Sequence, residues 1–445
     1  YVVAFAMIGS AISGVTFVSV PGMVAANGFA YLQMVMGFVV GQFIIAFVLV
    51  PLFYKLNLTS IYEYLENRFG IASYRTGAWF FFISKMLGAA VRMFLVCIVL
   101  QLLVFRPLGL PFLLNVVFTV GLVWLYTFRG GVKSLIWTDS LKTFCLLVSV
   151  GLCIYFIAKD LGYNFSGMFG AIFKNDYAKT FFFDDFNDRR FFFKQFLSGI
   201  FTVIATTGLD QDMMQRNMSC RNSKEAQKNI YVSGSMQLVV NLLFLMLGVL
   251  LYIFASQQHV AIPQKSDELF PMLATGGHFP VIVGILFIIG LISAAYAAAG
   301  SALTALTTSF TVDILESTKK RKTDAEVAGI RKKVHVGMAV VMGLVILIIN
   351  ALNNTSVIDA VYILSSYTYG PILGLFAFGI FTRNRLNDKY IALVAIVAPI
   401  ICFILDRNSV AWFNGYRFSY EILIINAILT FLGLTLLTKR KTVKL

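Results

Sequence analysis

The stretch that decides the fold is MIGSAISGVTFVSVPGM, residues 7–23, near the start of the chain. It is apolar enough to lie in a lipid bilayer, yet small and polar residues stand in its middle: Gly9, Ser10, Ser13, Gly14 and Thr16. Glycine weakens a helix by about 1 kcal/mol relative to alanine, and hydroxyl side chains offer the backbone other hydrogen-bond partners. Two interpretations are open. Unwound carbonyls of a broken helix can bind an ion, or the small residues can form a helix-packing face.

The composition places the whole chain in a membrane. Of its 445 residues, 59% are hydrophobic, and the mean hydropathy is +0.82, whereas soluble domains are roughly 45–50% apolar. The formal charge of +15 comes from short loops between apolar runs, which is the pattern of membrane topology and not of nucleic-acid binding. Because the chain opens at Tyr1 within an apolar run, we expect it to be a fragment that lacks its true start.

A membrane span needs about 20 mostly apolar residues. This rule predicts twelve helices, at 2–24, 30–54, 74–104, 110–127, 134–158, 191–209, 229–255, 279–315, 334–352, 357–381, 389–405 and 419–438. Lysine and arginine are concentrated in alternate loops, beginning with the loop between the second and third helices, and in the C-terminal tail. These segments are therefore predicted to be cytoplasmic.

Charged residues at bilayer depth are costly and indicate functional positions. The candidates are Lys85, Arg92, Asp139, Lys142, Asp210 and Asp212. Asp139 and Lys142 are three residues apart and share one helix face. They form either a self-neutralising structural pair or a cation site with Asp139 as ligand. Arg92 either pairs with another helix or binds a carboxylate or phosphate of a substrate through its planar guanidinium.

A second interrupted helix appears at IATTGLDQDMMQR, residues 204–216, where Thr206, Thr207 and Gly208 break the apolar run. Two broken helices in corresponding positions predict inverted five-helix repeats. The single predicted transporter domain, 1–445, would then comprise a first repeat at about 1–158, a second at about 191–381 and extra helices at about 389–438.

Several stretches together resemble the sodium/solute symporter family over essentially the whole chain. They are GSAISGVTFVSVPG (9–22), LTSIYEYLENRFG (58–70), YTFRGGVKSLIWTD (126–139), GLDQDMMQR (208–216) and SALTALTTSFTVDIL (301–315). The resemblance implies an all-α polytopic protein with the LeuT-type fold, and a helix preceding the first one of this fragment. The family includes symporters of sugars, proline, pantothenate and sialic acids.

The resemblance also implies positions for bound sodium. The carbonyls of the main site match Gly9, Ile12 and Ala294, but the two hydroxyl residues that the eighth helix normally adds are replaced by Ala297 and Ala298. A second sodium site found in some members matches Asp139 and Ser301, with Gly300 where a polar residue is common.

A small hard cation takes about six oxygen ligands, so the loss of two hydroxyls weakens the expected site. Lys142 stands where relatives often carry Gln. One hypothesis is that the Lys142 ammonium, paired with Asp139, takes the place of sodium and makes transport sodium-independent or proton-linked. The alternative is that carbonyls, Asp139, Ser301 and water still hold sodium weakly. Neither another metal nor another cofactor is expected.

Substrate-facing positions of the sialic-acid-like members match Ala11, Ser13, Thr16 and Tyr31. Arg92 lies about one turn from the arginine that those members use for a carboxylate. We therefore expect a secondary active transporter of a sugar, a sialic-acid-like solute or another organic acid in a bacterial inner (plasma) membrane.

Other classes of protein fit less well. The sequence contains no zinc motif, nucleophile–histidine constellation or phosphate loop, which argues against an enzyme. A substrate sensor derived from a transporter is the alternative that a degraded ion site favours. The expected partners are a small-molecule solute and the lipid bilayer, without nucleic acid or an obligate protein partner.

Overall fold

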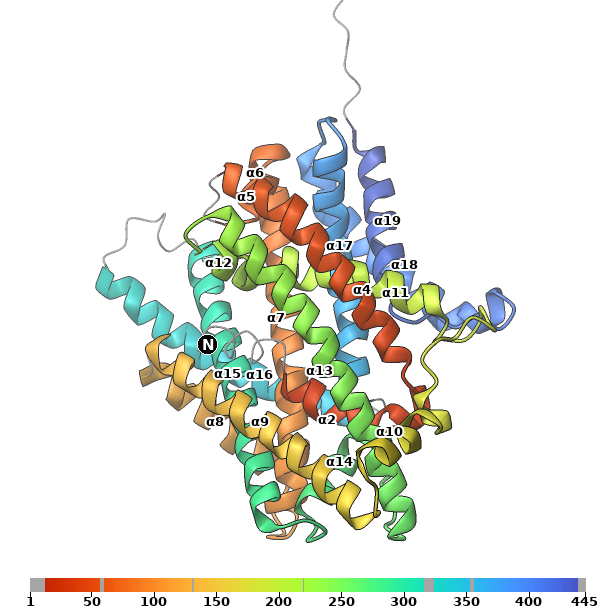
Figure 1. Ribbon diagram of the computed structural model, residues 1–445. Coiled ribbons are helices and arrows are strands. Elements are labelled where there is room, and N and C mark those ends of the chain that lie inside the picture. Colours follow the sequence, from red (N-terminus) through yellow and green to blue (C-terminus); the bar gives the residue numbers. More distant parts are fainter. Residues whose placement is uncertain are drawn as a thin grey trace, which may run out of the picture.

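The computed structural model is built of helices, most of them steeply inclined and side by side (Figure 1). It describes residues 13–56, 60–129, 132–218, 220–315, 324–352 and 356–438. Three predicted site residues, Gly9, Ala11 and Ile12, lie outside these ranges. Asp139 belongs to a helical stretch whose side chains are also outside the description.

The long helices follow the predicted order. They are α2 (Gly14–Gly22), α4 (Ala30–Ile44) continued by η1 (Ile45–Leu49) and α5 (Val50–Leu56), α7 (Ile71–Leu100) with η2 (Gln101–Phe105), α8 (Phe112–Arg129), α9 (Val132–Asp160), α11 (Phe192–Val203) with η4 (Ile204–Gly208), α13 (Ser223–Gln257), α15 (Val281–Ser309) with η6 (Phe310–Ile314), α16 (Asp324–Leu352), α17 (Val357–Phe381), α18 (Ile391–Trp412) and α19 (Ile422–Leu436).

Short helices connect them. They are α3 (Val24–Asn27), α6 (Glu63–Arg68), α10 (Phe165–Phe173), α12 (Gln211–Met218) and α14 (Leu269–Thr275), with single turns η3 (Asp176–Ala178), η5 (Ser266–Glu268) and η7 (Asp388–Tyr390). Within the described ranges, eight helices are long and apolar enough to cross a membrane, and two shorter apolar helices accompany them. The predicted all-helical membrane fold is thus confirmed.

Some predicted boundaries were wrong. The helix predicted at 334–352 begins at Asp324, and the helix predicted at 229–255 begins at Ser223. Both extensions are polar sequences. A rule that searches for apolar runs misses them, because a helix that leaves the bilayer no longer needs apolar side chains.

Helices α4 and α11 pack with their backbones in close approach. A Cβ atom at Gly37 would lie 2.1 Å from the carbonyl oxygen of Phe196, and one at Gly199 would lie 2.1 Å from that of Met34. Glycines at a membrane helix interface permit this distance and compensate for the absence of a hydrophobic driving force between helices in lipid. The contact joins the second predicted span to the sixth.

A proline inside α17 is supported from a neighbouring helix. Pro371 has no N–H, so the carbonyl of Tyr367 lacks its usual helical partner. The buried side chain of Asn426 on α19 donates hydrogen bonds to the carbonyls of Tyr367 (3.0 Å) and Ser366 (3.1 Å). Gly370 leaves room for this amide, because a Cβ atom there would lie 2.4 Å from it.

The close contact between α4 and α11 makes a testable prediction. Gly199→Ala should lower the unfolding free energy by about 1–3 kcal/mol, because the added methyl group overpacks a backbone contact. The measurement is thermal unfolding of the purified protein in detergent. Gly121→Ala on α8 is the matched control, since nothing lies within 4 Å of its Cβ position. Equal stability of both variants would show that the two helices are not in contact.

Candidate functional site

Helix α2 begins within the stretch where the sequence predicts a break, and the residues before Ser13 lie outside the description. Ser13 has extended backbone angles and caps the helix, its hydroxyl accepting a hydrogen bond from the backbone N–H of Thr16 at 3.0 Å. The two hydroxyl groups also lie 2.7 Å apart. A Cβ atom at Gly14 would lie 3.5 Å from the Cβ of Ala294. The structure therefore brings the start of α2 against the segment of α15 that carries the predicted sodium-site residues.

The predicted break in the sixth helix is confirmed. Helix α11 widens into the π-helical turn η4, which contains Thr206, Thr207 and Gly208, and the helix ends there. A new helix, α12, begins at Gln211, leaving Leu209 and Asp210 between the two. The hydroxyl group of Tyr62 donates a hydrogen bond to the carbonyl of Leu209 at 3.0 Å.

A buried cluster of charges lies beside this second break. The Lys85 ammonium on α7 lies 3.1 Å from a carboxylate oxygen of Asp210 and 3.0 Å from one of Asp212. The side chains of Lys85 and Asp210 are only 8% and 4% exposed. Removing such charges from water is costly, so the ion pairs and additional hydrogen bonds must compensate.

Hydroxyl groups from two further helices complete the cluster. Tyr369 on α17 donates to a carboxylate oxygen of Asp210 at 2.9 Å, and Ser301 on α15 donates to Asp212 at 3.3 Å. The backbone N–H of Met213 also donates to Asp210. Four separate segments of the chain are thereby held together at one polar point inside an apolar protein.

The sequence indicated Lys85, Asp210 and Asp212 individually as charges at bilayer depth but did not join them. Lys85 precedes the two aspartates by 125 and 127 residues. The available signal was the opposite charge of a lysine in the third span and two aspartates after the sixth, which could have indicated that they pair. The sequence marked Tyr369 only as an aromatic residue beside Gly370 and Pro371 that could line a cavity or pack, and nothing connected it with Asp210.

The candidate substrate residue Tyr31 is buried on α4, and its hydroxyl group lies 2.7 Å from that of Tyr362 on α17. Thr16 is also buried. The structure thus places Tyr31 in contact with α17, which the sequence did not predict.

Arg92 is half-buried on α7. Its guanidinium lies 4.0 Å from the position that a Cβ atom would take at Gly88, one turn earlier. Long helical side chains lean toward the N-terminus in this way.

The described part of the predicted sodium site does not supply the expected ligands. Ala297 and Ala298 have no side-chain oxygen. A Cβ atom at Gly300 would lie 3.0 Å from Thr127 on α8, so this position serves helix packing. The hydroxyl group of Ser301 is directed to Asp212. Of the predicted side-chain positions on α15, Ser301 alone thus carries an oxygen, and the sodium site remains a prediction.

Lys142 on α9 is buried, with 7% of its surface exposed. A buried ammonium needs a compensating charge or several hydrogen bonds. Its predicted partner, Asp139, lies among side chains that the structure does not describe, so the pairing remains a prediction.

The fold and the buried charges beside its broken helices define a membrane transporter of the LeuT type. The profile of the Sodium:solute symporter family matches residues 1–430, and the chain belongs to that family. It is therefore a secondary transporter, as the sequence stretches predicted.

Individual relatives agree with this assignment. The sodium/sialic acid symporter NanT of Aliivibrio fischeri is 26% identical over 423 residues, covering 89% of this chain and 78% of the relative. The sodium/sialic acid symporter SiaT of Proteus mirabilis is 24% identical over 412 residues, covering 89% and 79%. A substrate-bound, outward-open structure of a Na⁺-coupled sialic acid symporter has a TM-score of 0.80 at 20% identity, covering 98% of this chain and 90% of that one.

The lysine–aspartate cluster generates a prediction for stability. Lys85→Ala should lower the unfolding free energy by about 3–5 kcal/mol, because it leaves two buried carboxylates without their counter-charge. Thermal unfolding in detergent measures the change. The matched control is Lys179→Ala, whose partner Asp184 is 84% exposed; surface pairs contribute about 0–1 kcal/mol. Small and similar changes in unfolding free energy for both variants would show that the buried cluster does not stabilise the fold.

Proposed function

We propose that this protein carries a sialic acid or a related acidic sugar across a bacterial inner membrane by alternating access. The observation that supports the substrate class most directly is Arg92, a half-buried guanidinium held inside an apolar bundle. Arginine recognises a carboxylate with two parallel hydrogen bonds. Sialic acids are the solutes named for the two bacterial relatives above.

The surrounding groups suit the rest of such a solute. Ser13 and Thr16 offer hydroxyl groups at the start of α2, and Tyr31 offers an aromatic face and a hydroxyl group. Sugar hydroxyls both donate and accept hydrogen bonds, and hydroxyl side chains do the same. A simple apolar solute would make no use of these hydroxyl groups, whose hydrogen bonds are otherwise made within the protein.

The proposed transport cycle follows the predicted organisation of the chain. The first repeat, about 1–158, and the second, about 191–381, each begin with a broken helix, and the solute binds between them. In this proposal the C-terminal tail lies in the cytoplasm, because alternate loops ending with the tail are rich in Lys and Arg. No protein partner is needed for the cycle.

The proposal predicts a loss of affinity in Arg92→Ala. Removing one charge-assisted bidentate contact should weaken binding of N-acetylneuraminic acid by about tenfold or more. Isothermal titration with the purified protein measures this change. Arg75→Ala, an alteration of an exposed arginine near the start of α7, is the control. Unchanged affinity in the Arg92→Ala variant would show that Arg92 does not bind the carboxylate of the solute.

A counterflow experiment distinguishes a transporter from a substrate sensor. Proteoliposomes preloaded with unlabelled solute should accumulate labelled solute transiently if the protein is a carrier. A sensor on the same scaffold would bind the solute but show no exchange.

We further propose that the Lys142 ammonium substitutes for a coupling sodium ion. Two observations support this: the α15 positions Ala297 and Ala298 lack ligand oxygens, and Lys142 is buried on the adjacent helix α9. A tethered cation balances the charge of Asp139 without an ion from solution. The family as a whole is sodium-coupled, so this chain would be a departure from its relatives.

The substitution of lysine for sodium predicts uptake that does not depend on external sodium. Replacing sodium by choline should leave the initial rate of uptake by wild-type proteoliposomes nearly unchanged. Lys142→Gln should lose sodium-independent uptake, because the positive charge is gone, whereas Lys159→Gln at the exposed end of α9 should behave as wild type. Uptake by the wild-type protein that depends strongly on sodium would contradict the hypothesis that Lys142 replaces sodium.

A further inference from the structure

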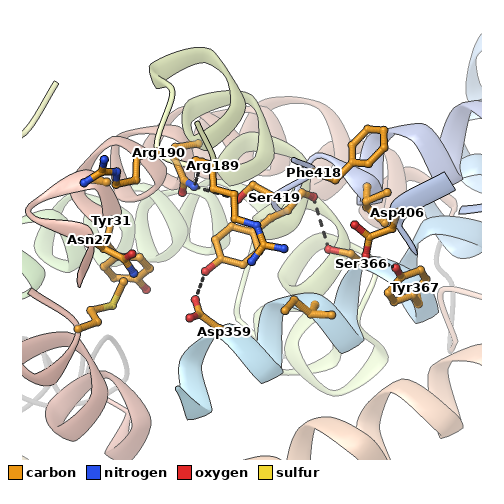
Figure 2. Close-up of a pocket in the computed structure, with 16 residues that line it drawn as sticks. Asn27, Tyr31, Arg189, Arg190, Asp359, Ser366, Tyr367, Asp406, Phe418 and Ser419 are labelled. Carbon is orange, nitrogen blue, oxygen red and sulfur yellow. Dashed lines mark hydrogen bonds between the residues drawn. The ribbon is translucent and has the colours of Figure 1, made fainter. Parts of the chain in front are cut away.

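Two hollows formed by the described residues differ in size. Figure 2 shows the first, which Tyr31, Asp359 and Tyr367 help to line and whose volume is about 110 Å³. The second, which we call the α8–α16 groove, lies between these two helices and has a volume of about 400 Å³. Pockets that hold small organic ligands measure about 300–1,000 Å³. Of the two hollows, the α8–α16 groove is therefore the one with room for an organic molecule.

The walls of the α8–α16 groove are apolar and face outward. The lining consists of valine, leucine, alanine and glycine with one tryptophan, Trp124, and contains no charged residue. Val117 on α8 and Val340 on α16 are 60% and 58% exposed. Helix α16 is long and apolar enough to cross a membrane, and α8 is a shorter apolar helix. We therefore expect the groove to open to lipid.

Two glycines create the groove. Nothing lies within 4 Å of the position that a Cβ atom would take at Gly121 on α8. A Cβ atom at Gly343 on α16 would lie 3.8 Å from the side chain of Val116, which is an ordinary van der Waals contact. Side chains elsewhere in a protein are closely packed, whereas these two positions leave space between the helices.

The α8–α16 groove has the length of one membrane leaflet. It extends over eleven residues on each helix, from Leu113 to Trp124 and from Val336 to Leu347. Eleven helical residues rise about 16 Å, and one leaflet contributes about 15 Å of the bilayer's hydrocarbon core. A transmembrane helix of another chain is about 10–12 Å wide, too wide for a hollow of this volume and length. An extended acyl chain fits both dimensions.

One end of the groove has the features of a membrane surface. The two ring nitrogens of His335 on α16 each lie 2.9 Å from a hydroxyl group, that of Thr127 on α8 and that of Thr307 on α15. Trp124 lines the groove about one turn from Thr127. Tryptophan is enriched where a bilayer meets water. The polar contacts of His335 thus join three helices at the end where lipid head groups are expected.

Positive charges on α16 lie just beyond this end. Arg331, Lys332 and Lys333 are exposed, and residues 327–335 contain no aspartate or glutamate. Lys332 and Lys333 precede Val336 by four and three residues, so they share the helix face that lines the groove. Lysine side chains extend from apolar surface to the head groups, and each basic residue near an anionic membrane contributes about 1 kcal/mol of attraction. The groove thus combines an apolar channel with a cationic end.

We propose that the α8–α16 groove binds an anionic phospholipid. One acyl chain lies along Gly121 and Gly343, and the phosphate accepts hydrogen bonds from Lys332 and Lys333. A zwitterionic phospholipid binds less well, because the cation of its head group competes for the phosphate and is repelled by the two lysines. Since α8 belongs to the first predicted repeat and α16 to the second, the bound lipid connects the repeats. No transported solute takes part, so the site is independent of the proposed function.

Trp124 serves as a reporter of the bound acyl chain. The triple variant Trp79→Phe, Trp137→Phe and Trp412→Phe keeps Trp124 as the one tryptophan of the chain. In phosphatidylcholine vesicles, phosphatidylglycerol with brominated acyl chains should quench its fluorescence at least twofold more than brominated phosphatidylcholine at the same mole fraction. This excess quenching measures the preference of the groove for an anionic lipid.

Two changes made in the triple variant should each abolish the excess quenching. Lys332→Gln combined with Lys333→Gln removes the cationic end of the groove. Gly121→Leu instead fills the channel with a side chain.

Each change has a matched control that should keep the excess quenching. Lys224→Gln combined with Lys228→Gln removes two exposed lysines on α13, and Gly151→Leu adds a side chain on α9 where nothing lies within 4 Å of the Cβ position. None of these residues lines the groove. Thermal unfolding in detergent shows whether each variant is folded.

The unaltered protein gives an independent measurement. In native mass spectrometry after extraction from mixed vesicles, it should retain one phosphatidylglycerol molecule in preference to phosphatidylcholine, and Gly121→Leu should lose this adduct. Equal quenching and equal retention of the two lipids overturn the proposal, and so does an excess that survives either change to the groove. Quenching by both lipids that increases as the protein is diluted in the vesicle identifies a second copy of the chain as the occupant and also overturns it.

Discussion

The interaction on which the rest of the structure depends is the sharing of one buried ammonium, that of Lys85, by two carboxylates. Asp210 stands where the sixth span ends, and Asp212 lies in the first turn of the next helix. In an apolar medium these charges cannot separate without a large penalty. The broken end of α11 is thereby fixed against α7, and Tyr369 brings α17 to the same point. These polar contacts fix the positions of α7, α11 and α17 relative to one another along their axes.

The architecture was largely predictable from the sequence because the bilayer restricts the choices. Apolar runs located the long helices in their order, eight of which, among the described residues, are long and apolar enough to cross a membrane. Thr206, Thr207 and Gly208 located the second break. The missed features are those in which the chain leaves the lipid, such as the polar beginning of α16 at Asp324. Short connecting helices were missed for the same reason, since hydropathy carries no signal for them.

The candidate site was predictable only in part. Sequence spacing placed Arg92 about one turn away from the expected arginine, and the role of its guanidinium remains a prediction. The contact between Tyr31 and Tyr362 joins residues 331 positions apart, which no local pattern encodes. Likewise nothing in the sequence indicated that the hydroxyl group of Ser301, a predicted oxygen ligand of a cation, donates a hydrogen bond to Asp212. The partner of a polar side chain depends on helix packing, and packing is a property of the folded chain.

The amide of Asn426 has a consequence for the last helix. The two helices after the predicted repeats look like additions to a complete transporter, but α19 supplies the donor that Pro371 denies to α17. Displacement of α17 relative to α19 would leave the carbonyl of Tyr367 without its hydrogen-bond donor. The last helix is therefore tied to the centre of α17 and is part of the transporter's packed body.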